Sequence, residues 1–446
     1  MTADGPADGR NALTLLVNGE QYFPRAWRVI EEARSEILLE TFILFDDPVG
    51  RELRQALMAA ARRGVSVDVT VDGYGSEGLS PEFIAGLTEE GVRFHIFDPR
   101  PRLLGVRTNI FRRMHRKILV ADGRVALIGG INFSADHLSS HGPLAKQDYA
   151  LEVRGPLAAD IREFARNALR EPGRTGRRRP AHALPDRHGV AEGANARLVV
   201  RDNGRHRNDI ERTYRAGIRL ARSDIIIANA YFFPGYRLLR DIVRAARRGV
   251  RVRLILQGQP DMRIARWAAR LLYQYLNDAG VDIYEYCKRP LHGKVACADE
   301  AWSTVGSSNL DPFSLALNLE ANVFVQDAEF TATLREALET LLAQDCQPAA
   351  IVRRPHGGLR RLWTAVVVFH VLRRFPAWSG SLPAHRPRLE SVAAPDPVPD
   401  PAPDPVPDPA PDPVPDPAPG ATPGPAPHRT PHPGPDAGGT DGRTDP

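Results

Sequence analysis

Hydrophobic residues alternate with polar ones in two parts of the chain that lie far apart. Val occupies every second position over residues 65–71, and Val and Leu do so over 250–256. This alternation has the period of a β-strand with one buried face. An amphipathic helical pattern precedes each strand and ends at Arg-Arg-Gly, which places Gly64 or Gly249 where a helix C-cap belongs. The pattern therefore predicts the same helix–strand unit twice.

The repeat extends on both sides of this unit. The apolar run LLETFILF at 38–45 corresponds to IIANAYFF at 226–233, and further strands begin near Val92 and Val281. Two unrelated strand–helix–strand units could match at one position by chance, but hardly at an ordered series of positions. Units of this kind favour parallel strands joined by helical crossovers. We therefore predict an α/β fold: two tandem α/β/α domains related by pseudo-two-fold symmetry, each with a mainly parallel or mixed central sheet.

A segment poor in apolar residues separates the two copies. Residues 171–189 read EPGRTGRRRPAHALPDRHG, and such a composition of Arg, Pro and Gly is typical of a linker or an exposed loop. We place the first domain at 10–170, a basic linker at 171–195 and the second domain at 196–350.

Each copy carries one motif of charged and polar residues with the same spacing from His to Asn. Histidine and lysine two positions apart on a strand point to the same face, and a Gly-rich turn returns the asparagine to them. A single such pair is weak evidence, but two at identical spacing favour a function, namely a phosphate-sized pocket of hydrogen-bond donors. The motif residues are His115, Lys117, Asp122 and Asn132 in the first copy and His292, Lys294, Asp299 and Asn309 in the second.

These residue types fit phosphodiester chemistry without a metal or another cofactor. The reaction needs a nucleophile, a proton donor for the leaving alcohol and fixed positive charge around the phosphoryl oxygens. One neutral imidazole can attack phosphorus to form a phosphohistidine, while the other, protonated, releases the first alcohol and then activates the second. The groups expected to hold the phosphoryl oxygens are Lys117, Lys294, Asn132 and Asn309.

Four carboxylates have different expected roles. Asp148 and Glu320 occupy equivalent positions at the start of strand-like segments, and each could fix the second nitrogen of an imidazole. Asp122 and Asp299 belong to the motifs, but we expect them at the far end of a hairpin, in a turn or an ion pair. Motif membership alone does not make them catalytic.

Charge and composition narrow the choice of partner only in part. The chain has a net charge of +5, but residues 393–446 hold nine Asp and two Arg, so the preceding region carries about +12. Such a field attracts anionic lipid, phosphorylated small molecules or nucleic acid. The three cysteines form no CxxC pair, which predicts a reduced compartment and no structural zinc.

The motifs resemble the HKD motifs of the phospholipase D superfamily, whose two-domain members bring both motifs to one active site. Stretches such as ILLETFILFDD, FRRMHRKILVADG and GGINFSADH resemble bacterial cardiolipin synthases of the B type, over about residues 10–390. The resemblance implies His115 as the nucleophile and His292 as the acid/base, although the symmetry of the repeat does not choose between them. One departure is Phe313, where many relatives have Arg.

The implied reaction transfers a phosphatidyl group from one phosphatidylglycerol to another and releases glycerol. Another type of cardiolipin synthase uses phosphatidylethanolamine as donor, so the donor rests on the B-type likeness. Alternatives are a phospholipase D-type hydrolase acting on lipid or nucleic acid, and a non-catalytic module that binds anionic lipid or nucleic acid. The leading hypothesis has phospholipid as substrate and no nucleic-acid partner, and it leaves the oligomeric state open.

A lipid substrate requires contact with a membrane surface. The first ten residues lack a secretory signal, and the apolar run at 362–372 is shorter than the ~20 residues of a spanning helix. We expect a peripheral protein on the cytoplasmic face, with an interfacial segment at 351–392, although a core helix with basic ends fits that run equally well. The basic stretch 100–113 is a second candidate for membrane contact. The Pro/Asp-rich residues 393–446 predict a disordered, polyproline-like tail.

Overall fold

The computed structural model describes most of the chain up to residue 394. Residues 1–396 form one compact unit. Residues 171–194 of the predicted linker 171–195, the apolar run at 362–372 and residues 395–446 of the predicted tail 393–446 lie outside the described residues. The described ranges are 10–99, 102–103, 106–107, 112–170, 195–258, 272–349 and 387–394.

The first half is built on a mixed eight-stranded sheet in which β2, β3 and β4 are parallel and the other neighbours are antiparallel. In spatial order the strands are β1 (Ala12–Val17), β9 (Tyr149–Arg154), β8 (Val125–Gly129), β7 (Ile118–Ala121), β2 (Glu36–Thr41), β3 (Ser66–Asp72), β4 (Arg93–Phe97) and β18 (Leu389–Val392). Its helices are α1 (Asn18–Glu32), α2 (Pro48–Arg62), α3 (Pro81–Glu89) and α4 (Pro156–Arg170), with the 3₁₀ turns η1 (Ala135–His137) and η2 (Ser139–Leu144) and the hairpin β5 (Arg102–Leu103)–β6 (Val106–Arg107).

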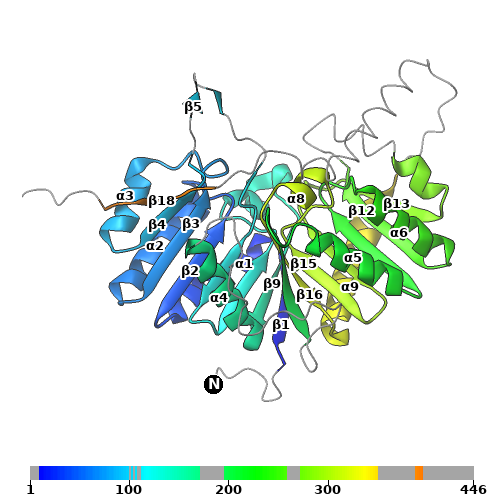
Figure 1. Ribbon diagram of the computed structural model, residues 1–446, viewed down its shortest axis with the longest axis horizontal. Coiled ribbons are helices and arrows are strands. Elements are labelled where there is room, and N and C mark those ends of the chain that lie inside the picture. Colours follow the sequence, from blue (N-terminus) through cyan, green and yellow to red (C-terminus); the bar gives the residue numbers. More distant parts are fainter. Residues whose placement is uncertain are drawn as a thin grey trace, which may run out of the picture. The chain divides into compact units, whose positions relative to one another are not determined.

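The second half repeats this order with a second mixed sheet of eight strands. Figure 1 shows the first half in blue to cyan beside the second half in green to yellow. The strands are β10 (Ala196–Arg201), β16 (Glu320–Val325), β15 (Trp302–Gly306), β14 (Lys294–Ala298), β11 (Asp224–Asn229), β12 (Arg251–Gln257), β13 (Val281–Tyr286) and β17 (Cys346–Pro348). The described helices are α5 (Asp209–Leu220), α6 (Tyr236–Arg247), α8 (Pro312–Ala316) and α9 (Ala328–Asp345). The predicted duplicated α/β architecture with mixed sheets is confirmed.

The repeated Arg-Arg-Gly has a physical cause. Gly64 and Gly249 follow α2 and α6 with φ of 85° and 90°, the left-handed conformation that glycine adopts without strain. The arginine before each glycine reaches back to the end of the preceding helix: Arg63 donates to the carbonyl of Ile30, and Arg248 to that of Ile218. Each Arg-Arg-Gly sequence therefore ends its own helix at the glycine, and its second arginine binds a carbonyl oxygen near the end of the preceding helix.

The prediction of a single buried face was wrong for β3. Its valines are buried, but the intervening Asp68, Thr70 and Asp72 are buried as well. Asp68 is held there by Arg93 and by the ring of His95. A buried charge is tolerated where partners of this kind surround it. The polar residues that alternate with the valines of β3 therefore lie on a second buried face and not on a face exposed to solvent.

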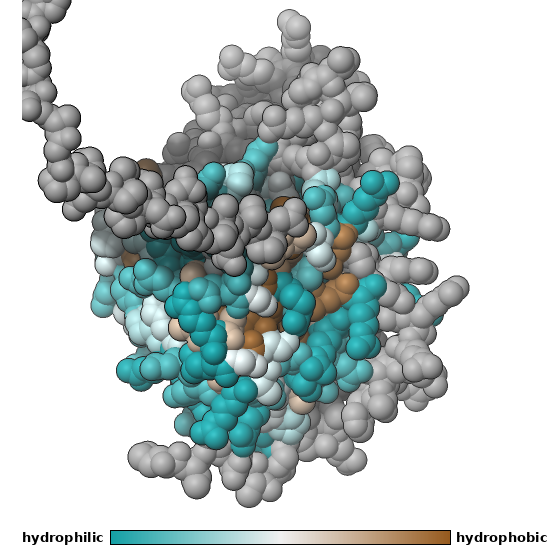
Figure 2. All heavy atoms as spheres, turned by 90° about the vertical axis from the view of Figure 1, so that its left-hand side faces the viewer, coloured by the Kyte–Doolittle hydropathy of each residue, from teal (hydrophilic) through white to brown (hydrophobic). Residues whose placement is uncertain are grey.

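The two halves share one hydrophobic core. Side chains of β7, β8, β9 and α4 pack with those of β11, β14, β16 and α9 in one cluster, while α1–α3 and α5–α6 cover separate cores on the outer faces. The outer side of the first half is mostly hydrophilic, with a smaller group of hydrophobic residues at its surface (Figure 2). Within the described residues, no helix combines the length and the hydropathy needed to cross a bilayer.

The strand β18 closes the edge of the first sheet. It pairs antiparallel with β4, and the Ser391 hydroxyl lies 2.9 Å from Nδ1 of His95. Residues 389–392 are the end of the predicted interfacial segment 351–392, and the structure places them in this edge strand. The rest of that segment, up to residue 386, lies outside the described residues.

Candidate active site

Each motif histidine is fixed by backbone from the other half of the chain. His115 precedes β7, and its N–H donates to the carbonyl of Leu319 at 2.9 Å; His292 precedes β14, and its N–H donates to the carbonyl of Gln147 at 2.8 Å. Leu319 and Gln147 are the residues immediately before Glu320 and Asp148. These backbone contacts therefore bring the histidine of one copy beside the carboxylate of the other.

The side chains pair in the same crossed manner. Nδ1 of His115 lies 3.1 Å from Oε2 of Glu320, and Nδ1 of His292 lies 2.5 Å from Oδ2 of Asp148. Both carboxylates are fully buried, while 11% of the His115 side chain and 17% of the His292 side chain remain exposed. Since each Nδ1 is occupied by a carboxylate, Nε2 is the nitrogen left for chemistry in both rings.

The contacts of His115 identify where its proton lies. Its Nδ1 is also 3.2 Å from the carbonyl oxygen of Ser307, which can only accept a hydrogen bond. Nδ1 therefore carries the proton, and the neutral ring has its lone pair on Nε2. The Ser307 hydroxyl donates to Glu320 at 2.5 Å and helps hold that carboxylate in place.

The lysines of both motifs lie in the same site. Lys117 and Lys294 are buried, and their ammonium groups donate to the carbonyl oxygens of His115 and His292, respectively. Burial lowers the pKa of Lys117 well below its usual value and that of Lys294 to about 8, and the charge of Lys294 adds to the shift at Lys117. The charge of Lys294 acts on Lys117 because both motifs line the same site.

The asparagines end the strands beside the histidine–lysine pairs. Asn132 follows β8 and Asn309 follows β15, at the ends that lie next to the starts of β7 and β14. Asn132 accepts a hydrogen bond from the N–H of Ile43, whereas the side-chain oxygen of Asn309 is buried with no hydrogen-bond partner among the described residues. The Asn309 oxygen is therefore available to accept a hydrogen bond from a donor on a ligand, such as a hydroxyl group.

The two histidine–carboxylate pairs differ in electrostatics. Burial raises the pKa of Asp148 to about 6, although Lys294 opposes the shift. Burial acts on Glu320 in the same sense, but the contacts with His115, Lys117 and Ser307 outweigh it, so the pKa of Glu320 is below its usual value. Glu320 is therefore the more firmly ionised of the two acids.

The pKa values of both motif imidazoles are below their usual range. Burial lowers the pKa of His115, with Lys117 adding to the shift and Glu320 opposing it. Burial lowers the pKa of His292 well below its usual value, and Lys294 and Lys146 add to this. Several cations around neutral rings create a field that favours an anion, and a bound phosphodiester would raise both histidine pKa values.

Asp122 and Asp299 lie at the other end of the sheets and take no part in the site. Both have positive φ at the turn after β7 or β14. The Asp122 carboxylate accepts hydrogen bonds from the N–H groups of residues 34–36 and from the Ser35 hydroxyl, and Asp299 does the same with residues 222–224 and Ser223. These contacts fix the turn that leads into β2 or β11, as their expected structural role implies.

His137 is a site residue that sequence reasoning missed. It is fully buried in η1, and its ring centroid lies 5.6 Å from that of His292. The second motif is followed by Leu310, Asp311 and Pro312 and has no matching histidine. A search for equivalent positions in two copies cannot find a residue that only one copy has. Phe313, the departure noted in the sequence, lies in α8, and its side chain is outside the described residues.

One group in the described part of the chain has the spacing of metal ligands. Atoms of His137, Asp148 and His292 lie within 4.8 Å of one another. The hydrogen bond between Asp148 and His292 already occupies two of these atoms, and Lys146 and Lys294 act on the same rings. A positive field disfavours a cation, so the group suits the sharing of a proton better than the binding of a metal.

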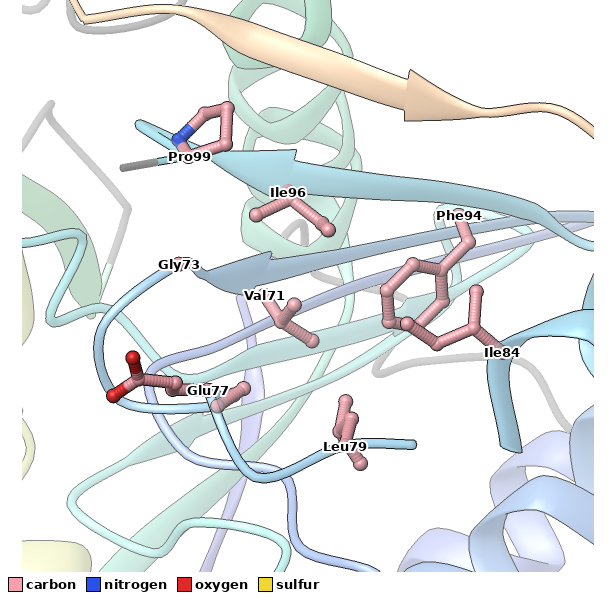
Figure 3. A pocket seen from close by; sticks show the side chains of 9 residues that line it. Val71, Gly73, Glu77, Leu79, Ile84, Phe94, Ile96 and Pro99 are labelled. Carbon is pink, nitrogen blue, oxygen red and sulfur yellow. The ribbon is translucent and has the colours of Figure 1, made fainter. Parts of the chain in front are cut away.

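An apolar cavity of about 240 Å³ lies outside the catalytic group. Val71, Phe94 and Ile96 of the sheet face Leu79 and Ile84 across it, as Figure 3 shows. The cavity has no histidine or lysine in its lining, so it does not offer the chemistry of the motifs.

Comparisons with known proteins agree with this geometry. The family described as "Cardiolipin synthase, PLD-like domain" matches residues 27–160 and 214–342. The chain is similar to cardiolipin synthase B of Escherichia coli K12, with 54% identity over 387 residues that cover 86% of this chain and 93% of that protein. It is 32% identical to cardiolipin synthase A of Pseudomonas aeruginosa UCBPP-PA14, over 80% of this chain and 72% of that protein.

A solved structure supports the fold independently. The phosphatidylserine synthase of Haemophilus influenzae superposes with a TM-score of 0.64 at 13% identity, covering 85% of this chain and 96% of that one. At this identity the likeness concerns the fold alone. Because the family match covers both halves of the chain and the bacterial relatives align over most of its length, the chain belongs to the cardiolipin synthase family of phospholipase D-like proteins.

Proposed function

We propose that the protein synthesises cardiolipin by transferring the phosphatidyl group of one phosphatidylglycerol to the terminal hydroxyl of another. The observation that carries this proposal is the crossed pairing of two motif histidines with two buried carboxylates in one lysine-rich site. The relatives named cardiolipin synthase match over most of the chain and support the choice of lipid substrate.

In the first step, Nε2 of His115 attacks phosphorus and the bond from phosphorus to the glycerol oxygen breaks. His292, protonated once the phosphodiester anion is bound, gives its proton to the departing glycerol. Glu320 is ionised, and its carboxylate stabilises the positive charge that develops on the His115 ring. The products of this half-reaction are free glycerol and a phosphatidyl group on His115.

In the second step, the neutral His292 removes the proton from the terminal hydroxyl of a second phosphatidylglycerol. That oxygen attacks phosphorus, the bond from phosphorus to His115 breaks, and cardiolipin leaves. The groups that hold the phosphoryl oxygens are the ammonium groups of Lys117 and Lys294 and the side-chain N–H groups of Asn132 and Asn309. The net reaction converts two phosphatidylglycerol molecules into one cardiolipin and one glycerol.

The substrate places the enzyme at a membrane surface. Phosphatidylglycerol is an anionic bilayer lipid, and the positive charge of the chain outside its acidic C-terminal part favours such a surface. We place the protein peripherally on the cytoplasmic face. Reduced activity at high salt, restored by a larger share of anionic lipid, would support this placement.

The decisive assay incubates the purified full chain with phosphatidylglycerol vesicles and quantifies every lipid product together with free glycerol. We expect cardiolipin and glycerol in equal amounts, and neither from His115→Ala. Phosphatidic acid without cardiolipin would replace the proposal by hydrolysis. Binding to the vesicles without any turnover would instead favour a non-catalytic lipid-binding module.

A further inference from the structure

His137 is a buried titratable group that the two-histidine mechanism does not use. It lies five residues after Asn132 in η1, and none of its surface is exposed. Nε2 of His137 accepts a hydrogen bond from the N–H of Asn132 at 3.2 Å. The first motif and His137 are therefore joined through the backbone of a residue that faces the phosphate site.

This contact fixes the tautomer of His137. A nitrogen that accepts a hydrogen bond carries no proton, so the proton of the neutral ring is on Nδ1. Nδ1 is buried and has no hydrogen-bond partner among the described residues, and it lies 3.9 Å from Oδ2 of Asp148. That oxygen is also the one bound to His292. The Nδ1–H group of His137 thus has no hydrogen-bond partner among the described residues and lies near the carboxylate that binds His292.

We propose that His137 is a positioning residue whose Nδ1–H donates to Asp148 in the working enzyme, keeping that carboxylate ionised and directed at His292. The inference rests on the proposed role of His292 as acid and base. A small movement of the ring closes the 3.9 Å gap to a hydrogen bond. A chain of contacts then runs from Asn132 through His137 and Asp148 to His292. Through these contacts the first motif influences the protonation of His292 in the second motif.

The surrounding charges agree with a neutral donor. The groups that face His137 are Asp148, His292, Asp136 at 3.6 Å from Nε2, and the three lysines 146, 294 and 117. Burial lowers the pKa of His137 well below its usual value, and the lysines act in the same direction. A neutral ring can donate to Asp148 without adding another positive charge beside His292.

The direction of the effect on pH dependence follows from this contact. A donor to Asp148 stabilises its carboxylate, and a carboxylate beside His292 stabilises the imidazolium that acts as the acid. Without the donor, Asp148 attracts the proton that it shares with His292 more strongly, so more of that proton lies on Asp148 and the pair as a whole loses it at higher pH. The plateau value of kcat should therefore fall, and the alkaline limb of the kcat profile, where the pair loses its proton, should move to higher pH.

Three substitutions separate the contact from simple packing. His137→Asn keeps an N–H near the position of Nδ1, His137→Gln keeps a polar atom near Nε2 only, and His137→Phe keeps the ring without either. His141→Phe is the matched control, because His141 is exposed in η2, four residues further along the chain.

We expect His137→Phe and His137→Gln to lower kcat at least tenfold, with a smaller change in KM. Their alkaline limb should move up by about one pH unit, the equivalent of one hydrogen bond. His137→Asn should stay within a fewfold of the wild type, and His141→Phe should be unchanged. The proposal would be overturned if the rate fell only in proportion to the amount of folded protein while the alkaline limb of the kcat profile stayed at the wild-type pH. His137 would then be a packing residue.

A second readout keeps this inference separate from the proposed lipid chemistry. NMR titration of ¹³C-histidine-labelled free protein follows His292 directly, without any substrate. We expect the His292 transition, which reports loss of the proton shared with Asp148, to move to higher pH in His137→Phe and to stay in place in His137→Asn. An unmoved His292 transition in both variants would contradict the contact, even if the wild type makes cardiolipin. A wild type without cardiolipin synthesis would instead remove the proposed function and leave the titration result standing.

Discussion

Asp148, in the first half of the chain, binds Nδ1 of His292, in the second half, at 2.5 Å. In the same way Glu320, in the second half, binds Nδ1 of His115, in the first half. Nδ1 of each motif histidine therefore binds a carboxylate from the other half of the chain. The duplicated chain forms one site because each half supplies the carboxylate that orients the histidine of the other half.

Removing either carboxylate should lower activity strongly. We expect Asp148→Asn and Glu320→Gln each to reduce kcat by about 10²–10⁴-fold, because the amide cannot stabilise an imidazolium and can select the wrong tautomer. Initial rates on phosphatidylglycerol vesicles, with circular dichroism to confirm folding, check this result. Near-normal rates in either variant would show that the crossed pair is not needed.

Two glycines provide a matched test of the carboxylate position. A Cβ at Gly130 would overlap the Asp148 carboxylate, whereas a Cβ at Gly64 meets open space in a positive-φ position. We expect Gly130→Ala to lower kcat at least tenfold by displacing Asp148 from His292. Gly64→Ala should leave kcat unchanged and cost about 1 kcal/mol of unfolding free energy. Equal effects of the two variants on kcat would argue against this role of Gly130.

The motif aspartates should affect stability and not the chemical step. Asp299→Ala removes an acceptor of three backbone N–H groups and one hydroxyl, and we expect a loss of about 1–2 kcal/mol of unfolding free energy with little change in kcat per folded molecule. Asp122→Ala should behave alike. Chemical denaturation and rate assays on the same samples measure both quantities.

The pH dependence of that stability has a definite sign. The hydrogen bonds, working against burial, lower the pKa of Asp299 to about 2, below the ~3.9 of an unfolded chain. The stabilising contribution is therefore complete above about pH 4 and is lost as the pH falls towards 2. The difference in stability between Asp299→Ala and the wild type should shrink over this window, and a difference that grew there would refute the assignment.

Two truncations distinguish β18 from the sequence after it. A chain ending at Asp396 keeps the strand on β4 and should retain activity and thermal stability. A chain ending at residue 386 uncovers the edge of β4 and removes Ser391 from His95, so we expect a lower melting temperature. Thermal unfolding followed by vesicle assays tests both, and equal melting temperatures would show that β18 contributes nothing measurable.

The sequence predicted the parts of the site that the repeat contains twice. The histidines, lysines and asparagines, and the equivalence of Asp148 with Glu320, follow from matched spacing in two copies. The crossed partners do not, because they depend on how the two halves face each other, and that arrangement is set by the shared core of α4, α9 and the strands between them.

Features present once were missed for a physical reason. His137 has no counterpart in the second copy, and its role appears only when Asn132 and Asp148 are placed around it. The strand β18 has four residues and finds its partner almost three hundred residues earlier in the chain. Such a short segment has no periodicity from which a strand could be predicted.

The central claim is that the phosphatidyl group passes through His115 on its way to a second phosphatidylglycerol. The most direct measurement mixes the enzyme briefly with ³²P-labelled phosphatidylglycerol and divides the sample. One portion is denatured in alkali, which preserves the bond from phosphorus to histidine, and its labelled peptide is mapped; the other portion receives an excess of unlabelled phosphatidylglycerol before it is stopped. We expect the label on the peptide that contains His115 and its recovery in cardiolipin after the chase. Label on His292, or a chase that yields only phosphatidic acid, would contradict the account.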